Sequence, residues 1–225
     1  MNTPGPARTN AVRVSPLRYL LRQAGWHIKV VDGAEVSGMD MELEALADLS
    51  TCDRLGLKGR GSAAWLQQRG IELPPKPNRL IERVDGFVIA RYGDNEFALA
   101  DFRHAVSPLV DGLRRVHEEQ RPEASYDVPR AHGQAAFGLC GAPALQALAA
   151  LCPADLRAQS FGPGDVLQTL CGGVSAQLWN LTRDDTERLV LLCDVSVARH
   201  QWAALHEAIV AAGGRAGAQA AWFVR

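Results

Sequence analysis

The stretch LGLKGRGSAAWL, residues 55–66, places a glycine loop between a short apolar run and a helix-forming segment. From Gly59 it matches the spacing G-x-G-x-x-A, which lets backbone N–H groups approach a phosphate at the start of a helix. Gly61 is the second glycine of that pattern. A dinucleotide-binding fold also needs an acidic residue at the end of the next parallel strand. The nearest acids, Glu82 and Asp85, precede a predicted hairpin strand instead, so we favour a tight strand-to-helix turn.

Two other groups have the residue types of catalytic or metal sites. Asp48, Ser50 and His104 are the types found in a serine-nucleophile triad, but the chain has no G-x-S-x-G motif. His200 and His206 lie six residues apart on a predicted helix, about 240° around its axis, and no Cys or carboxylate lies at ligand spacing. We therefore predict no catalytic residue and no metal ligand in this chain.

The cysteines offer one candidate nucleophile. Cys171 lies beside Gly172 and Gly173, where it is either a reactive thiol or, as we prefer, a small buried residue in a tight turn. The sequence indicates no basic neighbour that would lower its pKa. Five cysteines at wide spacing and without a C-x-x-C pair predict buried, reduced thiols. They are Cys52, Cys140, Cys152, Cys171 and Cys193.

Aromatic and basic side chains provide candidates for cofactor binding. Four tryptophans have the ring size to stack on a flat cofactor ring: Trp65, Trp179, Trp202 and Trp222. Trp65 and Trp202 lie at helix positions that should face the core, so we favour core packing. Four arginines are candidates to hold an anionic cofactor tail or an acidic partner surface: Arg60, Arg69, Arg79 and Arg83. A solvated face is the preferred interpretation, and we predict no cofactor-binding residue.

The composition is that of an ordinary globular protein. The 225 residues are 47% hydrophobic and 22% charged, with a formal net charge of −1. Because nucleic-acid and anionic-membrane proteins usually carry a basic excess, we expect neither as a partner. The first ten residues have no apolar signal segment, and no stretch has the length of a membrane helix. These features predict a cytoplasmic protein.

Charge is distributed unevenly along the chain. Residues 1–130 contain 18 basic and 18 acidic residues, whereas residues 131–225 contain 6 and 7. Surfaces that bind a partner are depleted of charge. The second part is therefore either an assembly surface or a domain with more core, and the sequence leaves both interpretations open.

Local signals predict an α+β chain with two similar halves and antiparallel sheets. Ser15 and Ser107, each followed by proline, are typical helix starts. Alternating apolar runs on either side of a polar turn at residues 93–95 predict a hairpin. The predicted units are a flexible N-terminus, a first α+β half, a polar linker and a second α+β half: residues 1–14, 15–118, 119–130 and 131–225.

The second half repeats the order strand, helix, hairpin, helix. Residues 137–148 align without a gap with residues 55–66, and apolar positions and two glycines coincide. Gly61 is replaced by Pro143, which suits a helix start but has no N–H to offer a phosphate. This difference predicts that the two copies share a turn rather than a phosphate site. The segment at residues 41–50 is either helix or strand.

The order of several motifs resembles the folate-binding aminomethyltransferase, or glycine-cleavage T-protein, superfamily. The motifs are DLS with a nearby Arg54, then VDGFVIARYGDNEFALA, FGPGDVLQT and LVLLCDVSVARHQWAAL. Within the superfamily, GLKGRGSAAWLQQRGIELPPKPN and GDNEF are most similar to the gamma subunit of heterotetrameric sarcosine oxidase and N-methylglutamate dehydrogenase. The resemblance spans roughly residues 46–212.

The resemblance implies a T-protein-like architecture and a place in a multi-subunit complex with alpha, beta and delta subunits. Such complexes remove hydride from an N-methyl amino acid to a flavin. The resulting imine passes its one-carbon unit to tetrahydrofolate or is hydrolysed to formaldehyde. FAD, FMN and NAD are then expected in alpha and beta, tetrahydrofolate in alpha and zinc in delta, with no cofactor in this chain.

The catalytic members of the superfamily have an acidic pair after the glycine hairpin turn. At the matching place this chain reads GGVSAQL, residues 172–178, and no carboxylate occurs between Asp165 and Asp184. We therefore expect a non-catalytic gamma-type subunit. The alternative is a free-standing, tetrahydrofolate-dependent aminomethyltransferase-like enzyme or a folate-binding regulatory protein.

Overall fold

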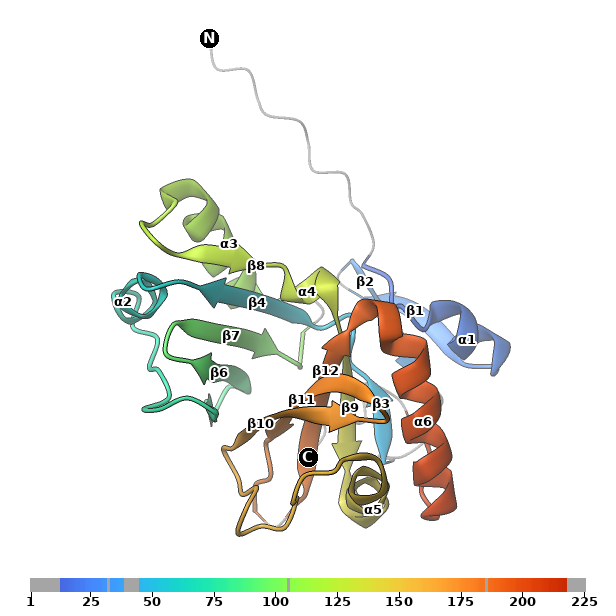
Figure 1. The fold of residues 1–225 in the computed structure, drawn as a ribbon. Helices are drawn as coiled ribbons and strands as arrows, with labels where there is room; N and C mark the ends of the chain where they lie inside the picture. The colour runs from blue at the N-terminus through green and yellow to red at the C-terminus, as the bar shows by residue number, and fades with distance from the viewer. Residues whose placement is uncertain (1–12, 32, 39–44, 105, 185, 218–225) are drawn as a thin grey trace.

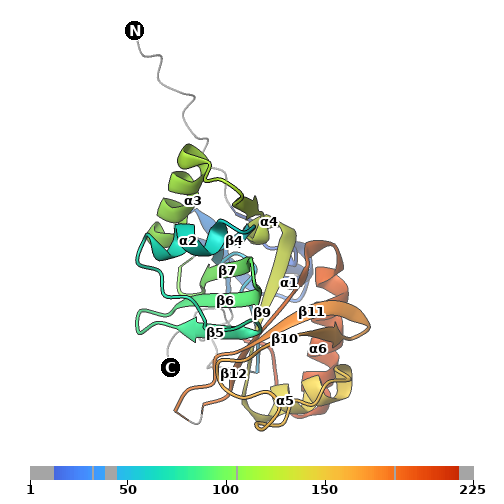
Figure 2. The same cartoon turned by 60° about the vertical axis from the view of Figure 1, so that its left-hand side comes forward.

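The computed structural model shows two antiparallel β-sheets stacked face to face, with helices on both outer sides (Figure 1). It describes residues 13–31, 33–38, 45–104, 106–184 and 186–217. Figure 2 shows α2 and α3 beside one sheet and α5 and α6 beside the other. The predicted α+β class with antiparallel sheets is confirmed.

The sheet built mainly from the first part of the chain is called the N-terminal sheet. Its strands, in the order in which they pair, are β5 (Arg79–Glu82), β6 (Phe87–Gly93), β7 (Glu96–Asp101), β4 (Asp53–Lys58) and β8 (Tyr126–Val128). Strands β6 and β7 flank the predicted polar turn and pair antiparallel. Helices α2 (Ser62–Gln67) and α3 (Pro108–Gln120) cover its outer face.

The sheet built mainly from the second part is called the C-terminal sheet. Its strands pair in the order β10 (Val166–Cys171), β11 (Val174–Asn180), β12 (Arg188–Asp194), β9 (Gln134–Cys140) and β3 (Leu46–Asp48). Helices α5 (Gly141–Leu151) and α6 (Ala198–Ala211) cover its outer face. Each sheet therefore buries one face against helices and the other face against the opposite sheet.

The C-terminal sheet receives its edge strand from the first part of the chain. Strand β3 precedes β4 in sequence but pairs with β9, and Leu46 lies opposite Leu139. Strand β8 precedes β9 but pairs with β4, and Gly56 lies opposite Val128. Sequence analysis assigns β3 to the first half and β8 to the polar linker, whereas β3 lies in the C-terminal sheet and β8 lies in the N-terminal sheet. Local patterns do not specify this pairing partner.

Between the sheets lies a core that both supply. Trp179 is fully buried there, and its indole Nε1–H donates to the Tyr92 hydroxyl at 2.9 Å. Phe102 packs edge-on against the same indole. Because each fully buried aromatic side chain contributes about 1.5–3 kcal/mol through apolar burial, this contact between the sheets favours a single folded unit.

The helix starts show how local chemistry sets element boundaries. Ser107 precedes α3 in an extended conformation, and its hydroxyl accepts from the Val110 N–H at 3.4 Å. Ser15 does the same for the Leu17 N–H at 3.0 Å, before α1 (Arg18–Gln23). The final helix, α6, begins directly after the 3₁₀ turn η1 (Val195–Val197).

The first described residues are tied to a small hairpin beside α1. Strands β1 (His27–Val31) and β2 (Ala34–Gly38) form this two-stranded sheet. Arg13 pairs with β2 through two backbone hydrogen bonds of 2.8 Å, which join it to Gly33 and Glu35. The expected flexibility of residues 1–12 lies outside the described residues, but Arg13 itself has a fixed place in the fold. The short helix α4 (Arg130–Gly133) leads into β9.

Candidate functional site

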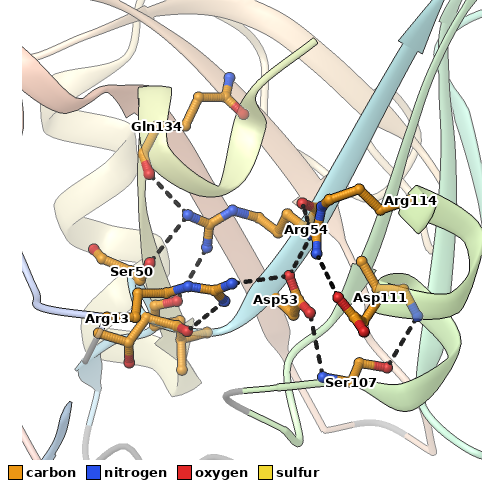
Figure 3. Close-up of polar contacts among 11 residues, drawn as sticks. Arg13, Ser50, Asp53, Arg54, Ser107, Asp111, Arg114 and Gln134 are labelled. Carbon is orange, nitrogen blue, oxygen red and sulfur yellow. Dashed lines mark hydrogen bonds and ion pairs between the residues drawn. The ribbon is translucent and has the colours of Figure 1, made fainter. Parts of the chain in front are cut away.

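The densest group of buried charges lies where β4 begins, at the junction of the two sheets (Figure 3). Arg54 is 2% exposed, and its guanidinium donates to the backbone oxygens of Leu49, Ser50 and Gln134 at 3.1, 3.1 and 2.7 Å. Burial lowers the pKa of Arg54 to about 10, so the side chain remains charged at neutral pH. Arg54 thus fixes the start of β4 to the start of β9.

Asp53, the residue before Arg54, is hydrogen-bonded to three different segments of the chain. Its carboxylate accepts from Arg114 on α3 at 2.7 Å and from Arg13 at 3.2 Å. It also accepts from the backbone N–H of Ser107 at 3.3 Å. The side chain is fully buried. Since a buried carboxylate is stable only when paired and hydrogen-bonded, these contacts fix α3 and the N-terminal segment onto β4.

Asp48 lies on the other side of the same junction, at the end of β3. It accepts from the Ser15 hydroxyl and, at 2.9 Å, from the Ser50 N–H. Burial raises the pKa of Asp48 above its ordinary value. The DLS motif of the sequence, residues 48–50, therefore forms a turn that places Ser50 at the junction.

A cavity of about 310 Å³ opens beside this group of charges. Its polar lining comes from Arg13, Ser50, His132 and Gln134, and its apolar walls come from Val14, Pro16, Val106, Ala131 and Val195, with Gly33 completing the lining. Burial, followed by the charges of Arg13 and Arg114, lowers the pKa of His132. The imidazole is therefore neutral at pH 7. This volume lies at the lower end of the range for small-molecule sites.

The polar groups around the cavity are held by the protein itself. Ser50 Oγ accepts from the Ala136 N–H at 3.2 Å, and its hydroxyl lies 3.4 Å from the Ala136 carbonyl oxygen. His104 Nδ1 lies 2.9 Å from Asp101. The serine and the histidine therefore have separate partners, and the structure does not join Asp48, Ser50 and His104 into a triad. Ser50 and His104 are therefore better placed to bind a ligand or to support the fold than to act as a nucleophile and its base.

The two histidines of α6 have no common ligand. His200 Nε2 lies 2.8 Å from the Gly172 carbonyl oxygen at the β10–β11 turn. Within the described ranges, no group of three or more His, Cys, Asp or Glu side chains is placed to hold a metal ion. His206, on the same helix, is not part of such a group.

The five cysteines are buried and free of disulfide bonds, as the sequence predicts. The sequence does not predict, however, which side chains contact Cys171. The Gly172 N–H donates to the Leu151 carbonyl at 3.0 Å, which brings Cys171 and Cys152 together. A hydrogen bond between the two thiols lowers the pKa of Cys171, and the Gln201 amide donates to its sulfur at 3.4 Å. No spacing rule connects Cys152 with Cys171, because a strand and a helix end separate them.

Three of the four candidate tryptophans are core residues. Trp65, Trp179 and Trp202 are 4, 0 and 3% exposed, which leaves no ring face available for a pterin. Trp65 packs edge-on against His117, and its Nε1–H donates to Gln120 at 3.2 Å. Trp222 lies outside the described residues.

The four candidate arginines do not converge on one site. Arg60 lies 3.7 Å from Glu123 and Arg83 lies 2.8 Å from Asp85, both at the surface. Arg79 forms an ion pair with Asp165. Arg69 donates to the Trp65 carbonyl and to Gln120, and its guanidinium lies over the Trp65 ring. The four arginines therefore have four different sets of partners rather than one shared site.

Both glycine N–H groups in the loop before α2 are already hydrogen-bonded within the protein. The Gly59 N–H donates to Asn95 at 2.8 Å, and the Gly61 N–H donates to Ala124 at 2.9 Å. Gly59 has a φ of +131° and Gly141 a φ of +74°, so both strand-to-helix corners use the left-handed region. The predicted turn function is supported, because the donors that a phosphate would need are already paired.

The structure gives a separate, steric reason for a glycine at position 61, which the sequence does not reveal. A Cβ atom at this position would lie 2.1 Å from the Glu123 carbonyl oxygen. Position 61 therefore has a steric requirement beyond that of a helix start. The backbone that leads to β8 passes against the glycine, and no side chain fits between them.

The turn that joins β10 to β11 is where the resemblance drawn from the sequence would place acidic residues. Gly172 and Gly173 both have positive φ, at +57° and +82°. Ser175 and Gln177 follow on β11, and the Gln177 amide oxygen accepts from Gln134 at 3.1 Å. Amide and hydroxyl groups thus occupy this strand, and they can bind but cannot act as a carboxylate base at neutral pH.

Two solved structures share this fold. One is a chain of heterotetrameric sarcosine oxidase from Corynebacterium sp. U-96, solved in complex with pyrrole 2-carboxylate. It aligns with a TM-score of 0.65 and 22% identity, over 88% of this chain and 94% of that one. The chain has an aminomethyltransferase-like fold. The other structure, aminomethyltransferase T of the glycine cleavage system from Bartonella henselae, supports the same conclusion.

That second structure aligns with a TM-score of 0.65 and 15% identity. The alignment covers 94% of this chain and 61% of the aminomethyltransferase chain. No protein-family model matches the sequence, and no curated protein matches it. Among the described residues, no helix is both long and apolar enough to cross a membrane.

Proposed function

We propose that this chain is a non-catalytic, gamma-type subunit of a heterotetrameric, sarcosine oxidase-like complex that oxidatively demethylates an N-methyl amino acid. The observation that carries the proposal is the extent of the fold match. The alignment covers 94% of the sarcosine oxidase chain, compared with 61% of the aminomethyltransferase. A chain with this fold throughout is what a T-protein-like subunit of such an oxidase would be.

The geometry of the sheet junction supports a non-catalytic role. Asp53 holds three segments together, and Arg54 donates to three backbone oxygens. These charges position the backbone and are not aligned as a nucleophile, a base and an orienting acid. In the proposed complex FAD, FMN, NAD, tetrahydrofolate and zinc would be bound by the alpha, beta and delta subunits, in a cytoplasmic assembly.

The second candidate is a tetrahydrofolate-dependent aminomethyltransferase or a folate-binding regulatory protein. It is favoured by the equally close fold match to aminomethyltransferase T, with the same TM-score of 0.65. Titration calorimetry of the purified chain with tetrahydrofolate separates the two candidates. The subunit proposal predicts no saturable heat, and micromolar affinity would favour the second candidate instead.

Co-expression with the large flavoprotein subunits tests the assembly directly. We expect a tagged copy of this chain to co-purify with them in fixed stoichiometry and with oxidase activity toward an N-methyl amino acid. Within that complex, His104→Gln and Cys171→Ser should leave kcat within about twofold, because neither side chain would touch the substrate. A chain that purifies alone, or a kcat that falls a hundredfold in either variant, contradicts the proposal.

A further inference from the structure

The edge of β1 that faces away from β2 has no neighbour within the described ranges. β1 pairs with β2 over its whole length, from His27 opposite Gly38 to Val31 opposite Ala34. β2 is also held on its other side, where Arg13 pairs with it. Figure 1 shows this hairpin beside α1, at the side of the molecule. Because a two-stranded hairpin gains stability from a third strand, the edge of β1 is a place where a further strand can pair.

The backbone groups of Val30 and Ile28 point toward this free edge. The Glu35 N–H donates to the Arg13 carbonyl at 2.8 Å, so it points away from β1. Val30 lies opposite Glu35 and therefore belongs to a pair that exchanges no backbone hydrogen bond. Backbone groups alternate in direction along a strand, so those of Ile28 have the same orientation as those of Val30. The N–H and C=O groups of both residues are directed at the free edge, and no described segment of the chain bonds to them there.

The edges of the two larger sheets are bridged or short. Leu46 of β3 accepts from the Gly217 N–H at 2.8 Å, which covers part of that edge. β5 and β10 lie against each other where Arg79 pairs with Asp165. β8 has only three residues. Native proteins protect edge strands in these ways. β1, with five residues, is longer than β8 and has no bridging segment among the described residues.

The side chains of this edge strand are apolar and exposed. Val30 and Val31 are 59 and 46% exposed, whereas Glu35 and Ser37 on β2 are 4 and 5% exposed. Within the hairpin, β2 is therefore the buried strand and β1 is the exposed one. A strand with exposed β-branched residues and unpaired backbone groups is a template for pairing with another chain. The backbone groups specify an extended occupant, and the valines favour an apolar one.

Lys29, at the centre of β1, restricts which strand can pair there. It is exposed and lies opposite Val36, so the hairpin places no carboxylate directly across from it. In a centred antiparallel pair of two copies, Lys29 would lie opposite the same lysine, and like charges in that position are destabilising. An Asp or Glu in that position would instead form a favourable cross-strand pair. The charge therefore disfavours a second copy of this chain and favours a different, acidic partner strand.

We propose that the free edge of β1 binds an extended segment of a partner subunit, which carries an Asp or Glu opposite Lys29 between two β-branched residues. The backbone groups of Ile28 and Val30 form the main-chain hydrogen bonds, and Val30 and Val31 pack against the apolar side chains of the added strand. Only the identity of the partner rests on the proposed function. Addition of a strand of this chemistry to β1 is tested separately, with a peptide.

The probe is the peptide acetyl-TTVEVTT-amide, whose central glutamate can lie opposite Lys29 with a valine on each side. Titration into the ¹⁵N-labelled full chain should give saturable nuclear magnetic resonance shifts of the Ile28 and Val30 amides. Hydrogen exchange of these two amides should be fast in the free chain and at least tenfold slower with the peptide bound. Acetyl-TTVKVTT-amide should bind about fivefold more weakly at low ionic strength, because its lysine lies opposite Lys29.

Two variants test the backbone and the charge separately. Val30→Pro removes an N–H that faces the free edge and no bond to β2, so it should abolish peptide binding while the hairpin remains. Lys29→Glu should reverse the preference between the two peptides, and it keeps the test valid if proline disturbs the hairpin. The matched control Val210→Ala trims a valine on α6 that is 51% exposed, and it should leave binding unchanged.

Three results would overturn the proposal. They are shifts that do not saturate, equal affinity of the native chain for the two peptides, and Ile28 and Val30 amides that are already protected from exchange in the free chain.

Assembly with the flavoprotein subunits tests the source of the strand. In the co-purified complex, hydrogen exchange across residues 27–31 should be at least tenfold slower than in the free chain, and Lys29→Glu should weaken assembly about fivefold. A complex in which β1 exchanges as fast as in the free chain would overturn the assignment of the partner but leave the subunit proposal intact. A chain that does not co-purify contradicts the subunit proposal, and the peptide titration then decides strand addition by itself.

Discussion

At the scale of single residues, Asp53 is the side chain on which the sheet junction depends. It accepts from two arginines, which lie 40 and 61 residues away in sequence, and from the backbone of Ser107. A buried ion pair often contributes little net stability compared with apolar packing, but removing one partner leaves the other charge buried and unpaired. The cost of losing Asp53 should therefore exceed the net contribution of the intact ion pairs.

Asp53→Asn tests this asymmetry without changing the size of the side chain. We expect the free energy of unfolding to fall by about 3–5 kcal/mol, because the arginines at the junction lose their shared carboxylate. Urea denaturation followed by circular dichroism measures the change. Glu123→Gln is the matched control, since Glu123 is 93% exposed beside Arg60, and its loss should cost less than about 1 kcal/mol. Equal losses in the two variants would contradict this account.

At the scale of secondary-structure elements, the corner between β4 and α2 depends on glycine for two different reasons. Gly59 needs positive φ, whereas Gly61 has ordinary φ and lacks room for a side chain. The backbone at Glu123 and Ala124 passes so close to this corner that the Gly61 N–H donates to Ala124. Close packing of the segment that leads to β8 is therefore the reason for glycine at position 61.

A pair of alanine substitutions separates packing from helix propensity. Gly61→Ala should destabilise the chain by about 1–3 kcal/mol, since its methyl group would collide with the Glu123 carbonyl. Gly112→Ala, in α3, has nothing within 4 Å of the added methyl and should stabilise by about 0.5–1 kcal/mol. Thermal unfolding of both variants provides the comparison. Changes of the same sign would show that the corner is not sterically constrained.

At the scale of the whole molecule, β3 joins the two sheets, because it precedes the N-terminal sheet in sequence but pairs in the C-terminal sheet. Strand β3 completes the edge of the C-terminal sheet, where Asp48 lies opposite Phe137. Strand β8 does the same in the N-terminal sheet, where Lys58 lies opposite Tyr126. Trp179 and Tyr92 then connect the two inner faces. We expect neither part to be stable alone, because residues 131–225 would lose their edge strand β3 and each part would lose a buried face.

Expression of two fragments tests this interdependence. Residues 131–225 alone lack β3 and should give poorly dispersed amide resonances and no cooperative unfolding transition. Addition of residues 13–130 should restore a native-like spectrum by complementation, and residues 13–225 as one chain serve as the control. A cooperative, well-dispersed spectrum from residues 131–225 by themselves would mean that β3 is not required.

Features governed by near neighbours in sequence could be predicted from the sequence alone. Alternating apolar residues predict the β6–β7 hairpin, and the serine before Pro108 predicts the start of α3, because strand faces and helix caps depend on residues a few positions apart. Burial of the cysteines and of Trp65 and Trp202 followed from composition and helix periodicity in the same way.

Tertiary structure decided what depends on segments far apart in the chain. All of the following involve backbone or side chains from distant elements: the contacts of Asp53 and Arg54, the hydrogen bond between the Cys152 and Cys171 thiols, and the steric limit at Gly61. The cavity beside His132 likewise exists only where α4, the N-terminal segment and two loops meet. Local periodicity carries no information on which surfaces will face each other, since that choice is made when the two sheets pack and β3 joins the C-terminal sheet.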